Sequence, residues 1–379
     1  MTSVTSLKRE KATFGILCLL PFLAFLSLTF YSFYTVSKMI LLAESGAFFL
    51  LLVLNTQLVG RWYKWWIIAL NVASVAVTLF YHSGLGAAAA FFNLLIAIFI
   101  FNNLILRREE KRILHFITAS LLFLLYFASN FGRLYGQIVM RDADGVLLNP
   151  NVVGMLLLAL LFHAFNFISG LELEKRKKHL LLVLTVAIFG YLIYFTSCRS
   201  AMLALVIFLL LLALGRGYKG PMPYAIYKLA AVGALLLSLA FTLAYVVLSD
   251  RLGEISLLGK SLFTGREIVW QSAFGLISES PIFGNGTDYL LATVGGAWTT
   301  SAHNTLLSIW YTLGVIPTAT VTLFFVNRNR GKAECERDRI SVIALLSSTV
   351  ICFFESFYAD PTIGIFFELF LLSNVRSEK

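Results

Sequence analysis

Long apolar segments, separated by short polar connections, make up most of the chain. A helix that crosses a bilayer needs roughly 20 consecutive apolar residues, and segments of that kind recur from one end of the sequence to the other. We expect membrane-spanning helices at residues 12–36, 40–58, 65–82, 84–106, 113–130, 151–169, 179–196, 199–215, 226–249, 303–326, 340–358 and 361–375. The pattern predicts an all-α, polytopic integral membrane protein in which residues 1–379 form one domain with about 12 transmembrane helices.

The composition excludes the soluble classes of protein. Of the 379 residues, 59% are hydrophobic and 13% are charged, whereas soluble domains contain roughly 25% charged residues. The mean hydropathy of +0.84 is also too high for a disordered chain, which has to stay solvated. The four cysteines show neither a CxxC spacing nor a Cys/His pattern. The sequence therefore indicates no zinc site and no disulfide framework.

The basic residues predict the orientation in the membrane. The net charge is +10, and if the N-terminus is placed inside, most Lys and Arg residues fall in inner segments, with clusters at 107–112, 175–178 and 328–339. Cytoplasmic loops of membrane proteins carry such an excess of Lys and Arg. We therefore expect both termini in the cytoplasm. The charge gives no reason to expect a nucleic-acid partner.

Two outer connections are long, at about 131–150 and 250–302. Loops longer than roughly 12–15 residues are usually functional or disordered. The second one has the pattern of a structured loop, because Thr264 and Glu267 match a capping box and the residues that follow predict a short amphipathic helix near 265–278. We expect the function of the protein at this loop, between the ninth and tenth transmembrane helices.

Several starts of outer helices carry unusual residues. Arg199 and Arg266 fall in the first turn of expected helices, and His303 opens another. A cation at a helix N-terminus opposes the helix dipole by about 0.3–1 kcal/mol, whereas an anion bound there would reverse that effect. Free backbone N–H groups and an arginine side chain together suit a phosphate group. These positions predict an anionic ligand at the outer membrane face, with a histidine able to act as a base.

Each of these positions also has a simpler interpretation. Arg199 could extend to outer lipid headgroups, Arg266 could pair with a carboxylate of its own loop, and His303 could cap its helix or pack against it. The Asn-Pro-Asn motif at 149–151 could form only a helix cap and a turn. Taken one at a time, the residues do not decide between the two interpretations.

Acidic residues inside apolar segments are functional candidates by default, because a charge in a bilayer is costly. Glu368 falls in the middle of such a segment, whereas Glu44 and Glu355 lie closer to the outer interface and could be solvated. Asp142 and Asp144 have the carboxylate spacing of some metal-dependent glycosyltransferases. No third ligand is visible, so we expect no metal site. The remaining histidines are expected to be structural or interfacial.

The motifs are more specific in combination than alone. In chain order they are Asn-Pro-Asn (149–151), Thr-Ser-Cys-Arg-Ser-Ala-Met-Leu (196–203), Thr-Gly-Arg-Glu-Ile-Val-Trp (264–270), Pro-Ile-Phe-Gly-Asn-Gly (281–286) and Ala-His-Asn (302–304), followed by Gly314. In this order, from about 147 to 317, the chain resembles the O-antigen polymerase and O-antigen ligase superfamily of bacterial envelope enzymes. The first five apolar segments match that superfamily only in their apolar character.

The resemblance implies an activity and roles for particular residues. Such enzymes take an oligosaccharide linked to undecaprenyl diphosphate and transfer it to an acceptor glycan at the outer face of the bacterial inner membrane, without a metal or another cofactor. By resemblance, Arg199 and Arg266 hold the donor diphosphate, and His303 activates the acceptor hydroxyl. The supporting candidates are Asn149, Asn151, Asn304, Trp270 and Asp288. A chain-length regulator or other envelope-assembly proteins would be the protein partners, beside the lipid bilayer itself.

Three functions stay open at this point. A polymerase would join repeat units of an O-antigen, capsule or exopolysaccharide, whereas a ligase would move the finished chain to lipid A–core. The ligase pattern is met by Arg199 with Leu203 and by His303 with Gly314, but Pro317 stands where Gly, Thr or Tyr is expected. We therefore favour the polymerase. A lipid-linked oligosaccharide transporter or flippase is the alternative of another class, and it should show broken helices with polar residues near the midplane.

Overall fold

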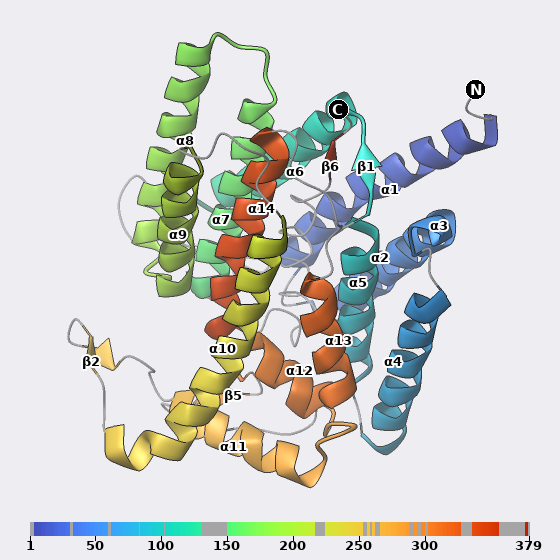
Figure 1. Ribbon diagram of the computed structural model, residues 1–379, viewed down its shortest axis with the longest axis vertical. Helices are drawn as coiled ribbons and strands as arrows, with labels where there is room; N and C mark the ends of the chain where they lie inside the picture. Colours follow the sequence, from blue (N-terminus) through green and yellow to red (C-terminus); the bar gives the residue numbers. More distant parts are fainter. Residues whose placement is uncertain are drawn as a thin grey trace.

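The computed structural model shows a bundle of helices of different lengths (Figure 1). It describes residues 4–30, 33–59, 62–82, 84–101, 103–130, 150–216, 224–252, 256–257, 260–261, 266–287, 292–294, 297–299, 302–326, 336–355 and 376–377.

The helices follow the expected apolar segments closely. They are α1 (Val4–Thr29), α2 (Tyr34–Leu54), α3 (Thr56–Val59), α4 (Trp62–Tyr81), α5 (Leu85–Phe101), α6 (Arg108–Asn130), α7 (Pro150–Ser169), α8 (Lys175–Phe195), α9 (Arg199–Arg216), α10 (Tyr224–Leu252), α11 (Arg266–Glu279), α12 (Thr305–Leu313), α13 (Val315–Val326), α14 (Glu336–Ser348) and the 3-10 helix η1 (Thr349–Phe353).

The described strands are short and form three separate pairs. The parallel pair is β1 (Ile105–Leu106) with β6 (Arg376–Ser377). The antiparallel pairs are β2 (Ser256–Leu257) with β3 (Lys260–Ser261), and β4 (Ala292–Val294) with β5 (Ala297–Thr299). Strands of two or three residues do not make a layer of the fold, so the architecture of the described chain is that of a helical membrane protein.

Five described helices are long and apolar enough to cross a membrane: Lys8–Thr29, Thr35–Leu54, Lys64–Tyr81, Pro150–Ser169 and Lys175–Phe195. Shorter apolar helices lie at Leu85–Phe101, Arg199–Leu214, Gly233–Leu248 and Arg339–Phe353. The protein is therefore a multi-pass membrane protein. The count of about 12 spans stays a prediction, and the expected span at 361–375 lies outside the described residues.

Helices α7 and α8 are both apolar but differ in how much of their surface is buried. Every side chain from Val152 to Leu161 on α7 is buried, because this helix is apolar all round and packs between its neighbours. Helix α8 is also apolar enough to cross a membrane but leaves most of its large side chains exposed, as expected of a helix that faces lipid. The exposed apolar surface thus belongs to the membrane boundary of the protein.

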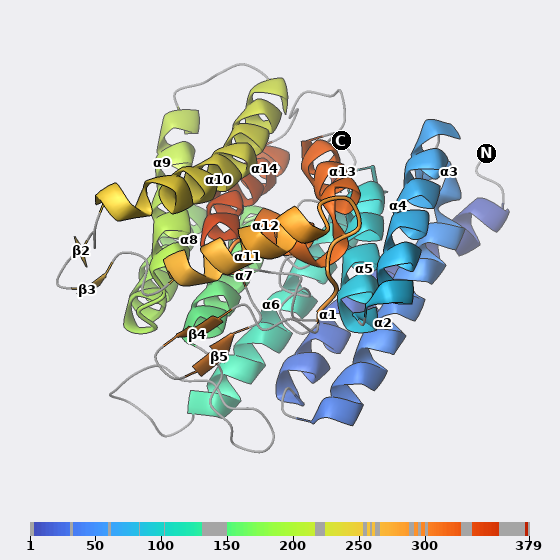
Figure 2. The ribbon, with the colours of Figure 1, turned by 90° about the horizontal axis from the view of Figure 1, so that it is seen from below.

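Helix α11 lies across one end of the bundle, below α10 and α12, whereas helices such as α8 and α9 run lengthwise (Figure 1). The loop that joins α7 to α8 is at the opposite end of the bundle. The basic cluster at 175–178 follows this loop, at the start of α8. Figure 2 looks at the α11 end and shows α11 passing over α12. The first residues of α9 and the residues before α12 are therefore in reach of α11.

The prediction of a single helix at 303–326 is wrong in one respect. The structure breaks this segment at Gly314 into α12 and α13. The backbone of Gly314 has φ +91°, in the region that favours glycine. A Cβ atom at this position would collide with the carbonyl group of Ile282, and a Cβ atom on Gly284 would lie 2.6 Å from the backbone nitrogen of Gly314. Two glycines thus let the turn at 281–286 enter the break.

Hydrogen bonds from this turn satisfy the carbonyl groups that the break leaves open. Asn285 donates its backbone N–H to the Tyr311 carbonyl oxygen at 2.7 Å, and Gly286 donates to the Thr312 carbonyl oxygen at 3.0 Å. In return, Val315 donates its backbone N–H to the Pro281 carbonyl oxygen at 3.1 Å. The turn therefore replaces the missing helical hydrogen bonds and holds the end of α11 against α12.

Candidate functional site

Two arginines begin helices at the α11 end of the bundle. Arg199 is the first residue of α9, and Arg266 is the first residue of α11. Both side chains therefore start from a first helical turn, where a cation opposes the helix dipole and an anion is favoured. Arg199 is exposed, whereas the side chain of Arg266 is only 17% exposed.

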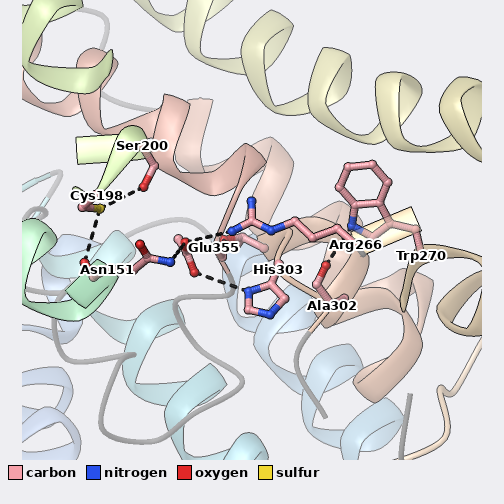
Figure 3. Close-up of polar contacts among 9 residues, drawn as sticks. Asn151, Cys198, Ser200, Arg266, Trp270, Ala302, His303 and Glu355 are labelled. Carbon is pink, nitrogen blue, oxygen red and sulfur yellow. Dashed lines mark hydrogen bonds and ion pairs between the residues drawn. The ribbon is translucent and has the colours of Figure 1, made fainter. Parts of the chain in front are cut away.

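Glu355, directly after η1, joins the candidate positions. Its Oε1 atom lies 3.3 Å from Nη2 of Arg266 and accepts a hydrogen bond of 2.8 Å from Nδ2 of Asn151. Its Oε2 atom lies 3.5 Å from Nδ1 of His303. Figure 3 shows the three side chains directed toward this carboxylate from different elements. We call Asn151, Arg266, His303 and Glu355 the Glu355 cluster.

The local backbone before α12 explains the position of His303. Asn304 is the N-cap of α12, and its Oδ1 atom accepts a 3.0 Å hydrogen bond from the backbone N–H of Leu307. Its Nδ2 atom donates to Oγ of Ser238 at 2.6 Å. His303 adopts φ +48°, which costs a residue other than glycine roughly 1–3 kcal/mol, and residues strained in this way cluster at active sites and ligand clamps. Asn304 is therefore a structural support, and His303 is the residue that it presents.

The turn before Arg199 is locked onto the start of α7. Ser197 has φ +57°, and the Cys198 side chain is fully buried. The thiol of Cys198 donates to the Asn151 carbonyl oxygen at 3.5 Å and lies 3.3 Å from Oγ of Ser200. Burial raises the pKa of this thiol. A Cβ atom on Gly154 would collide with Cys198, so close packing fixes the approach of Arg199 to the cluster.

The electrostatics favour an anion. Burial lowers the pKa of the Arg266 guanidinium; Glu355 opposes this shift, and the positive charge of Arg199 adds to it. The two guanidinium groups therefore act on each other although they come from different helices. Arg199, Arg266 and Glu355 together carry a net positive charge, which a bound phosphate or diphosphate would balance.

Trp270 supports the site from the buried side. It is 1% exposed, and its Nε1 atom donates a 2.9 Å hydrogen bond to the carbonyl oxygen of Ala302, the residue before His303. Its ring makes an edge contact with Tyr245 at 5.8 Å between centroids. In this structure the ring of Trp270 packs inside the protein. Stacking on a sugar would require the ring to face solvent, which it does not.

The other predicted residues fall as follows. Asn149 and Asp288 lie outside the described residues, as do Asp142 and Asp144. Within the part of the chain that the structure describes, no three His, Cys, Asp or Glu side chains form a group that could hold a metal ion.

Sequence reasoning missed the central position of Glu355. The signal was present, because Glu355 falls inside the expected apolar segment 340–358, and an acidic residue there is a functional candidate. It was assigned instead to Glu368, which lies outside the described residues. The simpler interpretation of Arg266 named carboxylates of its own loop, whereas the carboxylate that Arg266 meets in the described structure is 89 residues away.

Comparison with protein families adds an independent finding. Residues 184–322 match the family described as O-antigen ligase. This segment begins in α8, ends in α13 and contains Arg199, Arg266 and His303. Comparison with curated proteins and with solved structures gave no match. The family match confirms the resemblance over residues 184–322, and the chain is a multi-pass membrane protein with a segment similar to the O-antigen ligase family.

Proposed function

We propose that this protein is a glycosyltransferase that moves an oligosaccharide from undecaprenyl diphosphate to an acceptor sugar, at the outer face of the bacterial inner membrane. The observation that carries the proposal is the meeting of Arg266 and His303 at Glu355, with Arg199 close enough to act on Arg266. The family match supports the same class of reaction. A lipid-bound donor also explains why a carbohydrate enzyme has so much apolar surface.

The roles divide between the charged groups. Arg199 and Arg266 would bind the donor diphosphate and stabilise its charge as the glycosidic carbon–oxygen bond breaks. His303 would accept the proton of the attacking acceptor hydroxyl, a contribution of roughly 10²–10⁴-fold for a general base. The 29% exposure of the His303 side chain leaves it accessible to an acceptor, whereas the more deeply buried Arg266 suits a group that excludes water.

We propose a polymerase in preference to a ligase. Pro317 is the departure from the ligase pattern, and it lies in the first turn of α13, where proline is compatible with a helix. A polymerase takes a second lipid-linked repeat unit as its acceptor, and a ligase takes lipid A–core. A chain-length regulator would be a partner of the polymerase.

The broken helix does not favour a transporter. Transporters use such breaks to expose backbone groups to an ion or substrate. Here the turn at 281–286 lies in the break, and its Asn285 and Gly286 N–H groups bind the carbonyl groups of Tyr311 and Thr312. The break is therefore occupied by the protein itself.

A reconstitution experiment tests the proposal. The purified full-length protein in nanodiscs is given lipid-linked oligosaccharide from the source bacterium, with either a second lipid-linked repeat unit or lipid A–core as acceptor. A ladder of longer lipid-linked chains supports the polymerase, and glycan on lipid A–core supports the ligase. Movement of the donor across vesicle membranes without any transfer would contradict both and support a flippase.

A further inference from the structure

Glu355 is held as firmly as the residues around it. Its backbone N–H donates to the Ile351 carbonyl oxygen at 2.9 Å, and its own carbonyl oxygen accepts a 2.7 Å hydrogen bond from Oγ1 of Thr305. Its carboxylate accepts from Asn151. Both the main chain and the side chain are thus restrained, by η1, α12 and α7. A carboxylate fixed in this way can orient a neighbouring side chain.

The neighbour that it can direct is His303. The Nδ1 atom of His303 lies 3.5 Å from Oε2 of Glu355, and the second ring nitrogen points away from the carboxylate (Figure 3). A carboxylate beside Nδ1 favours the proton on that nitrogen, which makes Nε2 the ring nitrogen that accepts a proton. The positive φ of His303 sets the direction in which the side chain leaves the backbone, and the carboxylate contacts the ring at Nδ1.

We infer that Glu355 is a positioning residue for the proposed transfer reaction: it turns Nε2 of His303 toward the acceptor hydroxyl and occupies Arg266 until the donor diphosphate arrives. The inference rests on the proposed function and assigns a role to a residue outside the matched family segment, which ends at residue 322.

The reaction balances without a further reagent. The acceptor oxygen forms a bond to the anomeric carbon of the donor sugar, and its proton passes to Nε2 of His303. The bond from that carbon to the phosphate oxygen breaks, and undecaprenyl diphosphate leaves with the electron pair. The imidazolium then returns its proton to water. Glu355 takes up no proton in this scheme and stabilises the positive charge that the ring gains.

The contact with Arg266 adds a second consequence. In the donor-free protein the carboxylate of Glu355 is the counter-charge of Arg266, at 3.3 Å. A diphosphate that binds Arg266 has to replace this contact and meets a negative charge close by. Glu355 should therefore assist turnover while it weakens donor binding. A carboxylate that only ties α11 to η1 would not have these two opposite effects. Its loss would loosen both the fold and the donor site, so turnover and donor affinity would fall together.

The opposite directions of these effects define the experiment. Glu355→Gln keeps the shape of the side chain but removes its charge. In nanodiscs it should lose about 10²-fold or more in kcat, with affinity for undecaprenyl diphosphate unchanged or higher, measured as the ligand-dependent shift in unfolding temperature. Glu355→Asp, which restores the charge, should recover part of the turnover. Glu279→Gln, the same substitution at an exposed position of α11, should match the wild type in both measurements.

Four outcomes contradict the inference or its basis. Equal losses of turnover and donor affinity in Glu355→Gln would make Glu355 a structural residue. If Glu355→Gln turns over at the wild-type rate, Glu355 has no positioning role, although the proposed function stands. If the wild-type protein neither binds the lipid diphosphate nor forms product, the proposed function fails first. Should Glu355→Gln not fold, Asn151→Ala removes the amide that holds the carboxylate and should lower kcat but not donor affinity; an unchanged kcat there overturns the inference.

Discussion

In the part of the chain that the structure describes, two clusters of polar side chains differ in where their residues come from. The Glu355 cluster joins the starts of α7 and α11 to the residues before α12 and after η1. The second, which we call the histidine cluster, lies within helices. Its residues are Lys111, His115, His163, Asn166 and Ser341, from α6, α7 and α14.

The two clusters also differ in access. In the histidine cluster no side chain is more than 3% exposed. The Nδ1 atoms of His115 and His163 lie 2.9 Å apart, Lys111 donates to Ser341 at 3.5 Å, and Ser341 donates to Asn166 at 3.1 Å. In the Glu355 cluster His303 is 29% exposed. Similar residue types therefore serve as internal cross-links in one place and as an accessible site in the other.

The largest effect is expected from the two arginines. Replacing Arg199 or Arg266 by Ala should lower transfer by about 10²–10³-fold each, and the double variant should show no detectable product, because the leaving diphosphate loses both positive groups. Lys should rescue either position poorly, since its single ammonium group lacks the guanidinium fork. Chain extension in cells and in nanodiscs measures the effect, with Arg176→Ala, an exposed arginine at the other end, as the control. Near-normal transfer by Arg266→Ala would remove α11 from the reaction.

The next largest effect should come from His303. His303→Ala should reduce turnover by roughly 10²–10⁴-fold and leave donor binding largely intact, because both arginines remain. Product formation and binding of undecaprenyl diphosphate are scored separately, and His179→Ala, an exposed histidine on α8, serves as the control. A variant that loses donor binding would place His303 in the diphosphate site, and one with wild-type turnover would place the base elsewhere.

The histidine cluster should give a smaller effect of another kind. His115→Leu removes the imidazole that meets His163 at 2.9 Å and should destabilise the protein by about 1–3 kcal/mol, the cost of leaving a buried polar group without that partner. Transfer per folded molecule should not change. Thermal unfolding in nanodiscs measures the first and the transfer assay the second. A stable His115→Leu protein without transfer activity would erase the distinction between the two clusters.

The smallest perturbation is a single cysteine substitution. It tests whether the α11 end of the bundle and the end where α8 begins face opposite sides of the membrane. Glu279 at the end of α11 and Lys177 near the start of α8 are both exposed, and a cysteine at either position should leave transfer unchanged. In intact inner membranes an impermeant maleimide should label Glu279→Cys from the outside, and Lys177→Cys only after the membrane is opened. The wild-type protein gives the background of the native cysteines. The reverse pattern would invert the orientation that the basic residues predict.

Most of the helices could be predicted because they depend on local information. The apolar segments give the bundle, and the starts of α9 and α11 coincide with the residues that the sequence singled out, Arg199 and Arg266. The break at Gly314 could not be predicted in this way. It depends on Gly284, thirty residues earlier in the chain, whose backbone approaches so closely that neither position tolerates a Cβ atom.

The sequence by itself determined the class of protein, the positions of most helices and the order of motifs that resembles the superfamily, because hydropathy and short motifs are properties of neighbouring residues. The tertiary structure decided which charges meet. Glu355 lies 89 residues from Arg266 and 204 residues from Asn151, and no local pattern links such positions. Their contact depends on how α7, α11, α12 and η1 pack together, so the carboxylate at the centre of the site could be recognised only in the folded chain.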